Sequence, residues 1–308
     1  FAVLKPNTVE VPFAKGPETA AKLWVKLPEG ERDRTLLLAS GRAMRTAANS
    51  AVQRERMTRG ELDGEEQRLK VLDRVTITRE GARQMKGYQD GRIVEFRTDL
   101  PSQGFGRGER GVVRHAEDGK VALAMPDGSV RQFTPDKLPR NLAHDAVSIY
   151  QQKNIGVFEG DRIRWTDNDR PRGLLNGDIA QIESIGRHSM TVLTRDGERH
   201  ELGRLDPMIE RLDLAYAINV HIAQGMTADS GIILMSEREK MLNSTQSFLV
   251  AVTRIADSAT LVVDNVKALE RDVTRNIGGK TSAIEVAQST PTIQLPVPEK
   301  SLDFDFGL

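Results

Sequence analysis

Two short segments in the second half of the chain contain the residues best suited to act on a nucleotide. They are V-H-I-A-Q-G-M-T at residues 220–227 and V-A-V-T-R at residues 250–254. Arg254 ends an apolar run that we expect to be helical, just before a run typical of a buried strand. A guanidinium fixed there can reach phosphates on a facing domain and offset charge on a transferring phosphoryl group, as an arginine finger does. The plainer alternative is that Arg254 caps the last carbonyls of its own helix.

The segment at 220–227 combines polar side chains with a glycine. His221 and Gln224 are three residues apart and share a face if the segment is helical. Gly225 then frees the chain to turn toward the next strand, with Thr227 at the junction. Polar side chains at such a junction sit where α/β sheets bind ligands. The alternative is an ordinary helix end with surface polar residues.

A third segment, residues 160–173, gathers basic side chains around an aromatic one. Its candidates for contacts with a phosphate backbone and for base stacking are Arg162, Arg164, Trp165, Arg170 and Arg172. Its acidic residues partly neutralise them, and these are Asp161, Asp167 and Asp169. A solvated loop held by salt bridges is an equally good interpretation of the segment.

Other motifs are missing from the sequence. It has no G-x-x-x-x-G-K-[ST] loop to cradle phosphates and no strand that ends in paired acids to hold magnesium. The chain has no cysteine, and its five histidines are dispersed, so we expect no metal site. By itself the chain is expected not to hydrolyse ATP.

The expected fold class is α/β, with one α/β domain interrupted by an inserted all-β region. A compact apolar strand at 35–39 precedes a helix that we expect Ser40 to cap and Gly60 to end, which makes a βα unit. Residues 2–13 alternate loosely and predict an edge strand broken by two prolines.

From about residue 70 to 207 the pattern is β, punctuated by Asp-Gly pairs typical of hairpins. Residues 111–133 and 177–202 resemble each other, and we infer a pair of small SH3-like barrels arisen by duplication.

After residue 207 the α/β pattern returns. We expect helices at 212–224, 243–254 and 267–276 and buried strands at 231–235 and 259–263. In the second of these helices Phe248, Leu249 and Val252 should face inward.

The predicted domain organisation follows from these patterns. Residues 1–65 are the first part of the interrupted α/β domain, 66–207 the inserted β region and 208–287 the rest of that domain. Residues 288–308 form a Pro-rich extended tail.

Bulk composition adds little about partners. Lys plus Arg and Asp plus Glu number 44 each in 308 residues, so any basic surface must be local. No apolar run approaches the roughly 20 residues that span a bilayer, so no membrane insertion is expected. The absence of an initiator Met suggests a cut into a longer chain.

With these motifs in place, the sequence resembles a known family. Y-A-I-N-V-H-I-A-Q-G-M-T-A-D resembles motif V, and F-L-V-A-V-T-R motif VI, of RecD-like superfamily-one helicases. The version is most similar to the helicase part of conjugative relaxase-helicases of the TraI/TrwC (MobF) type. The likeness extends to T-L-L-L-A-S-G-R-A-M-R-T-A-A-N and to the segment at 160–173, and covers most of residues 20–287.

The resemblance implies that the interrupted α/β domain is a RecA-like domain (2A) and that the inserted β region is its SH3-like 2B region. It also implies roles for individual residues. Arg254 would contact the ATP γ-phosphate, and with Gln224 and Gly225 it makes up the expected catalytic set. His221 and Thr227 would couple the nucleotide site to single-stranded DNA. Asn49, where the motif IV region ends, would also contact DNA, although Ala48 stands before it in place of the family's leucine.

The resemblance also implies partners. The upstream RecA-like and relaxase domains of the same chain would bind most of the ATP and Mg²⁺, and the full parent would be an ATP-dependent DNA helicase and relaxase. The other partners would be single-stranded DNA and the type IV secretion coupling protein. The protein would reside in the donor cytoplasm and pass to the recipient through the secretion system.

Two other functions remain open from the sequence. The chain could be a translocation signal recognised by the coupling protein, with no enzymatic activity of its own. It could also be a plain SH3-like nucleic-acid binding module, which predicts salt-dependent single-strand binding by residues 70–207.

Overall fold

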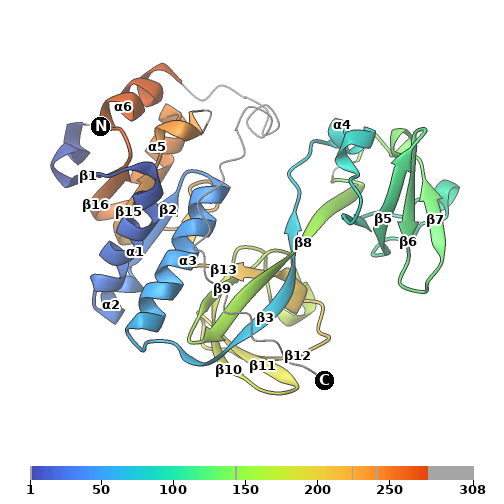
Figure 1. Ribbon diagram of the computed structural model, residues 1–308, viewed down its shortest axis with the longest axis horizontal. Coiled ribbons are helices and arrows are strands. Elements are labelled where there is room, and N and C mark those ends of the chain that lie inside the picture. The colour runs from blue at the N-terminus through green and yellow to red at the C-terminus, as the bar shows by residue number, and fades with distance from the viewer. Residues whose placement is uncertain (1, 143, 224, 241, 277–308) are drawn as a thin grey trace. The chain divides into compact units, whose positions relative to one another are not determined.

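The strand predicted at Thr35–Ala39 is present as β2 in a five-stranded, all-parallel sheet of order β1-β16-β15-β2-β14 (Figure 1). Its other strands are β1 Thr8–Glu10, β14 Ala217–Asn219, β15 Ala228–Met235 and β16 Ile255–Val263. β2, β14, β15 and β16 are apolar over most of their length, as strands covered on both faces must be. The expected α/β class with a parallel sheet is therefore confirmed.

The computed structural model describes residues 2–142, 144–223, 225–240 and 242–276. These residues divide into two compact units. The first contains residues 1–59 and the described residues from 216 onward, and the second is Gly60–Ala215. The predicted tail at 288–308, the segment 277–287 and Gln224 lie outside the described residues.

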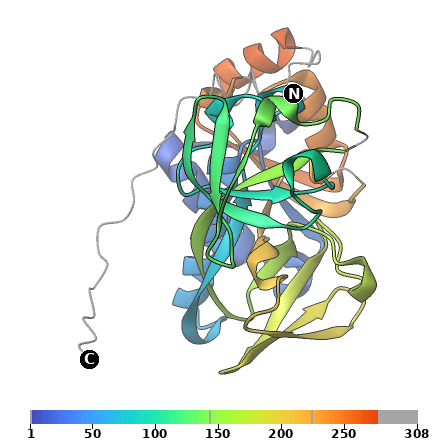
Figure 2. The same ribbon diagram turned by 90° about the vertical axis from the view of Figure 1, so that its right-hand side faces the viewer.

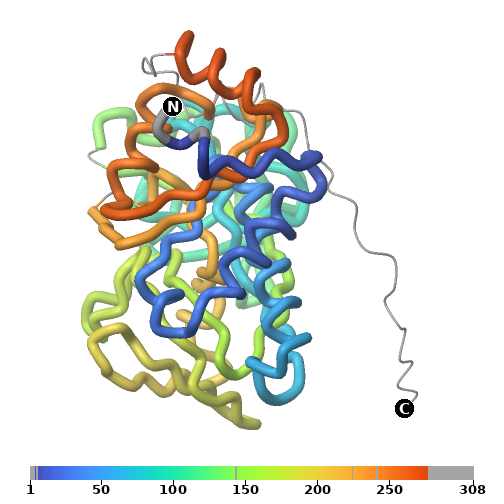
Figure 3. The backbone as a smooth tube through the Cα atoms, turned by 90° about the vertical axis from the view of Figure 1, so that its left-hand side faces the viewer, coloured from blue at the N-terminus to red at the C-terminus, as the bar shows by residue number. Residues whose placement is uncertain are grey.

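Helices cover both faces of the parallel sheet (Figure 3). α1 Gly16–Lys26 and α3 Arg42–Thr58 pack on one face, where Leu234 and Met44 meet at Gly16. α5 Thr245–Val252 and α6 Val266–Arg275 pack on the other, against the side chains of Leu38 and Ile233. Neighbouring residues of a strand point to opposite faces, so these apolar strands supply both layers of the core. The short helix α2 Glu29–Arg32 lies just before β2.

The helix predicted at 212–224 is wrong. Leu212–Leu214 is strand β13, Ala217–Asn219 is β14, and residues 220–223 form a turn. Both strands pair with neighbours distant in sequence, β13 with β9 Arg162–Trp165 and β14 with β2. Burial on both faces produces an apolar run without alternation, which periodicity alone does not separate from a buried helix.

Smaller corrections concern helix ends. Gly41, not Ser40, occupies the N-cap of α3, and the Ser40 hydroxyl instead donates a hydrogen bond to Glu239. Leu249 was expected to face inward but is 53% exposed. Of the edge strand predicted at 2–13 only β1 is a strand, because residues 2–7 form a 3-10 helix.

The second unit consists of two antiparallel sheets. The six-stranded sheet has the order β3-β8-β4-β5-β6-β7 and the five-stranded one β12-β11-β10-β9-β13. Strands of the first are β3 Asp63–Arg74, β4 Ile93–Phe96, β5 Arg110–Glu117, β6 Lys120–Ala124, β7 Val130–Phe133 and β8 Val147–Glu159. Those of the second, besides β9 and β13, are β10 Ile179–Ile185, β11 Ser189–Thr194 and β12 Arg199–Gly203. A short helix, α4 Arg79–Ala82, precedes β4.

The internal repeat predicted from the sequence is confirmed and is longer than expected. Strands β4–β7 (the first repeat) and β9–β12 (the second repeat) correspond one to one at a constant offset of 69 residues. Figure 2 shows the antiparallel strands of both repeats. Glu95 faces Arg110 across one hairpin as Arg164 faces Ile179 across the other. Even the β-bulge falls at the same place, after Val113 in one copy and after Ile182 in the other.

Glycines with positive φ recur at the same offset. Gly104 and Gly173, with φ of 78° and 74°, each end a 3-10 turn in the loop between the first two strands of a repeat. We call these two loops, residues 97–109 and 166–178, the paired loops. They have equal length because no residue is inserted or deleted between them.

Candidate functional site

The two motifs singled out from the sequence meet at the amino-terminal edge of the parallel sheet. Gly225 has a φ of +88°, the left-handed conformation that its predicted turn requires. β15 starts directly after Thr227 and β16 directly after Arg254. The backbone N–H of Ala228 donates to the carbonyl oxygen of Arg254 at 2.9 Å, which joins the two segments.

This location corrects one expectation. Ligands of α/β sheets usually bind beyond the carboxyl ends of the strands, and we placed His221 and Thr227 together there. His221 follows the carboxyl end of β14, whereas Thr227 precedes the amino end of β15. Residues 220–227 therefore run back along the sheet, and their two polar ends lie at opposite edges. Both side chains are exposed.

The Arg254 side chain is not a helix cap. It lies two residues beyond α5, and within the described residues it makes no side-chain hydrogen bond or ion pair. Its Nε atom is buried without a partner there. Since guanidinium donors rarely stay unpaired when shielded from water, this side chain is suited to an anionic partner.

A buried carboxyl lies at the opposite, carboxyl-terminal edge. Glu239 accepts hydrogen bonds from the Ser40 hydroxyl and from the backbone of Gly41. Burial raises the pKa of Glu239, and the charge of Asp264 adds to that effect, while the two hydrogen bonds oppose it. A side chain at Gly41 would collide with Glu239, so the contact requires glycine there.

Asn49 has a structural role in the described residues. Its side chain is buried, its Nδ2 donates to the carbonyl oxygen of Ala217 at 3.2 Å, and its Oδ1 accepts from the Ala217 N–H at 2.7 Å. These bonds attach α3 to the edge strand β14. The amide has no exposed surface to offer DNA.

Two arginines of residues 160–173 form ion pairs with carboxylates. Arg164 is buried and pairs with Asp213 at 3.4 Å. Arg172 pairs with Asp206 at 2.5 Å and Asp169 at 2.7 Å, and the hydrogen bond that it donates to Asp206 is the main reason that its pKa is raised. The salt-bridge alternative thus accounts for both.

The remaining members of that segment differ. Trp165 is fully buried, so its ring is not available to stack on a base. Arg162 is partly exposed in β9. Arg170 is exposed and has no ion pair among the described residues.

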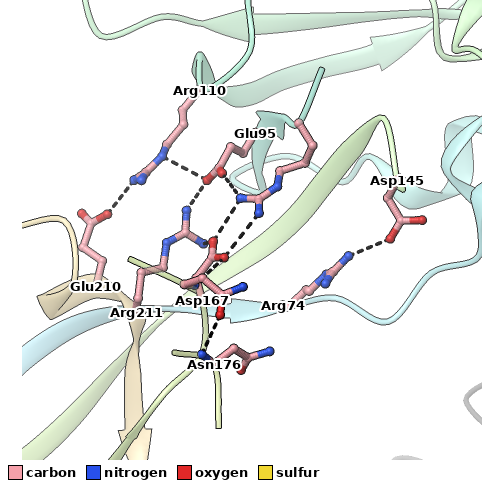
Figure 4. Close-up of polar contacts among 10 residues, drawn as sticks. Arg74, Glu95, Arg110, Asp145, Asp167, Asn176, Glu210 and Arg211 are labelled. Carbon is pink, nitrogen blue, oxygen red and sulfur yellow. Dashed lines mark hydrogen bonds and ion pairs between the residues drawn. The ribbon is translucent and has the colours of Figure 1, made fainter. Parts of the chain in front are cut away.

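An ion network that the sequence did not predict joins the two sheets of the second unit (Figure 4). Glu95 accepts from Arg97 at 2.6 Å, from Arg110 at 3.1 Å and from Arg211. Asp167 accepts from Arg97 at 3.0 Å. Burial by itself raises the pKa of Asp167, but the Arg97 hydrogen bond and the Asn168 N–H outweigh it and hold that pKa below its usual value.

Beside this network is a cavity of about 610 Å³, lined by residues of both paired loops. Its wall also includes Arg107, which lies between glycines in G-F-G-R-G. That flanking pattern was the available sequence signal for Arg107. Glu95 gave none, since a charge inside a strand is ordinarily read as pointing to solvent. Arg211 gave none either, and it ends a short 3-10 turn before β13.

No metal centre is found in the part of the chain that the structure describes, which contains no cluster of three or more His, Asp or Glu side chains suited to a cation. Nor is any helix there long and apolar enough to cross a membrane.

The site and fold define an α/β protein whose parallel sheet is interrupted by two antiparallel sheets. No protein-family model matches the chain. Over most of its length it is distantly homologous to the multifunctional conjugation protein TraI of Escherichia coli. It is 25% identical over 268 residues to the strain K12 protein, covering 86% of this chain and 15% of that one. A second Escherichia coli TraI is 26% identical over 297 residues, with coverages of 94% and 16%.

The chain thus spans about one sixth of the length of these relatives. Among solved structures it is similar to a Bacteroides Pif1 bound to single-stranded DNA, with 13% identity, a TM-score of 0.36 and coverages of 86% and 44%. The Pif1 helicase from Candida albicans gives 13% identity, a TM-score of 0.37 and coverages of 85% and 53%.

Proposed function

We propose that this chain is the 2A/2B portion of a conjugative relaxase-helicase, which contributes an arginine finger and single-strand contacts to ATP-driven unwinding during DNA transfer. The parallel sheet with helices on both faces is the RecA-like 2A domain. The two repeats are SH3-like parts of the 2B insertion. The distant homology to TraI over most of the chain supports this assignment.

The observation that carries the proposal is the joined amino edge of β15 and β16. There the Arg254 guanidinium makes no side-chain hydrogen bond or ion pair to the described residues, and the Arg254 carbonyl oxygen accepts from Ala228, which follows Thr227. Such an arrangement lets one loop sense both a phosphoryl group and a neighbouring ligand. ATP and Mg²⁺ belong mainly to the upstream RecA-like domain, with Gln224 and Gly225 completing the coupling segment on this side.

Single-stranded DNA is the proposed partner of the exposed polar residues. His221 and Thr227 are exposed, as is Arg170, and Arg162 is partly so. The burial of Asn49 and Trp165 favours a supporting role for those two.

The test uses the full-length parent protein. Arg254→Ala should lower DNA-stimulated ATPase activity by roughly 10³-fold or more, the range of an arginine finger, while single-strand binding persists. Arg34→Ala is the matched control, because Arg34 precedes β2 at the same edge and its side chain makes only exposed contacts, with Asp229 at 3.5 Å and the Gly30 carbonyl oxygen at 3.3 Å. ATPase activity retained in Arg254→Ala would remove the finger from the mechanism.

The alternative function is a translocation signal recognised by the coupling protein, and it can be tested with the same protein. A reporter fused to residues 1–308 would be followed from donor to recipient through the type IV secretion system. Transfer of the reporter, together with full ATPase activity in Arg254→Ala, would favour a signal read by the coupling protein over a part of the motor.

A further inference from the structure

The cavity of the second unit is lined by two equivalent loops, one from each repeat. Residues of the first paired loop (97–109) and of the second (166–178) line it. Because the two repeats share one register, the loops leave their sheets in the same way and carry the same 3-10 turn. Its volume of about 610 Å³ is in the range of a small-molecule site.

The wall of this cavity is positively charged. It contains five arginines and three carboxylates, namely Arg97, Arg107, Arg110, Arg170 and Arg211 against Glu95, Asp167 and Asp169. All three carboxylates already have arginine partners, because Arg97 and Arg110 hold Glu95, Arg97 holds Asp167 and Arg172 holds Asp169. The surplus charge therefore belongs to side chains that the network does not neutralise.

Two of these side chains are free within the described residues. Arg107 on the first paired loop and Arg170 on the second are exposed and have no ion pair or side-chain hydrogen bond there. One free guanidinium thus comes from each copy of the loop. A pair of planar guanidiniums around one space matches the geometry of a phosphate, whose oxygens accept paired N–H bonds.

Arg211 adds a second observation. Its side chain is only 4% exposed, and its Nη2 is bonded to Glu95. Its Nη1 is buried without a hydrogen bond, with Asp167 Oδ2 3.7 Å away. A buried donor left without an acceptor is costly, and an oxygen of a ligand in the cavity would supply one.

We infer that this cavity binds a phosphate group. Arg107 and Arg170, one from each paired loop, bind its oxygens, and the Glu95–Arg211 pair forms part of the same cavity wall. The phosphate is that of a nucleotide or of a strand's backbone. Binding of a strand here would rest on the proposed single-strand contact of Arg170. The site does not depend on Arg254 or on ATP hydrolysis, so its failure is distinguishable from failure of the arginine finger.

The experiment measures binding to the whole 308-residue chain by titration calorimetry at low salt. The probes are inorganic phosphate, thymidine monophosphate and an eight-residue oligothymidylate. Arg107→Ala/Arg170→Ala should weaken binding at least tenfold, and Arg107→Lys/Arg170→Lys should recover part of it, since lysine keeps the charge without the planar fork. Arg187→Ala, an exposed arginine in the β10–β11 turn, is the control and should bind as the unchanged chain does.

The probes separate the two sources of phosphate. Loss of monophosphate binding in the double variant assigns the site to a nucleotide, and loss confined to the oligothymidylate assigns it to a strand. Equal binding of every probe by the double variant and the unchanged chain overturns the inference, as does failure of the unchanged chain to bind any of them. Thermal unfolding of each variant checks that the fold is intact.

Discussion

Ala228 and Arg254 are joined by a backbone hydrogen bond of 2.9 Å at the amino-terminal edge of the parallel sheet. The bond fixes the main chain at Arg254 through the sheet, and the side chain takes no part in it. A substitution of Arg254 can therefore remove the guanidinium without removing the hydrogen bond that holds the main chain in place.

The first prediction concerns stability. Arg254→Ala should change the free energy of unfolding by no more than about 0.5 kcal/mol, because the side chain has no hydrogen-bond or ion-pair partner to lose among the residues that the structure describes. Urea unfolding followed by circular dichroism measures it. A loss of several kcal/mol would mean that the guanidinium supports the fold, and the ATPase test would then need Arg254→Lys.

Asn49→Ala should destabilise the first unit by about 1–3 kcal/mol, because it leaves the buried N–H and C=O of Ala217 without partners. Asn49→Asp keeps the acceptor but sets a carboxylate oxygen against the Ala217 carbonyl oxygen, so it should destabilise at least as much as Asn49→Ala. Binding of oligothymidylate by the folded variant should match that of the unchanged chain. Weakened binding with unchanged stability would restore Asn49 as a DNA contact.

Intrinsic fluorescence tests the role of Trp165. The chain's two tryptophans, Trp24 and Trp165, are 1% and 0% exposed, so single-stranded DNA should not quench their emission. Trp165→Ala should cost about 3–5 kcal/mol, as truncation of a buried aromatic does, and Trp165→Phe should cost less. Strong quenching on addition of oligothymidylate would contradict the buried placement.

The Glu239 carboxyl predicts a pH dependence. Its folded pKa is raised, chiefly by burial, so its favourable contribution is complete below the unfolded value of about 4.3 and is lost as the pH rises through the folded value. Glu239→Gln should then raise Tm at pH 8 by about 2 °C or more, with the difference shrinking toward pH 4. Asp264→Asn provides the comparison for the neighbouring charge, and an equal shift at both pH values would count against burial as the cause.

Local patterns in the sequence were enough for much of the fold. β2 was predicted residue for residue, and the Asp-Gly turns led to the internal repeat. Residues 212–219 failed because their strands are defined by partners far along the chain, which no local period reports.

The candidate site was harder to predict from the sequence than the fold, because it also depends on partners far along the chain. Arg254 was singled out by its motif, yet whether Trp165 faces solvent or core depends on the register of β9 within its sheet. The same holds for Glu95, whose partner Arg211 is 116 residues away. Residue types indicate what a side chain can do, while register decides whether it is free to do it.

The repeat also bears on how the chain reaches its fold. Two copies of one hairpin pattern invite strands to pair with the wrong copy as the protein folds. Glu95 and Arg164 occupy equivalent positions in these copies and carry opposite charges, and both are buried. β13 brings Asp213 opposite Arg164, so the same strand mispaired with β4 would bury Asp213 against Glu95, two like charges in place of an ion pair. The opposite charges of Glu95 and Arg164 therefore favour pairing of β13 with β9 over pairing with the equivalent strand β4.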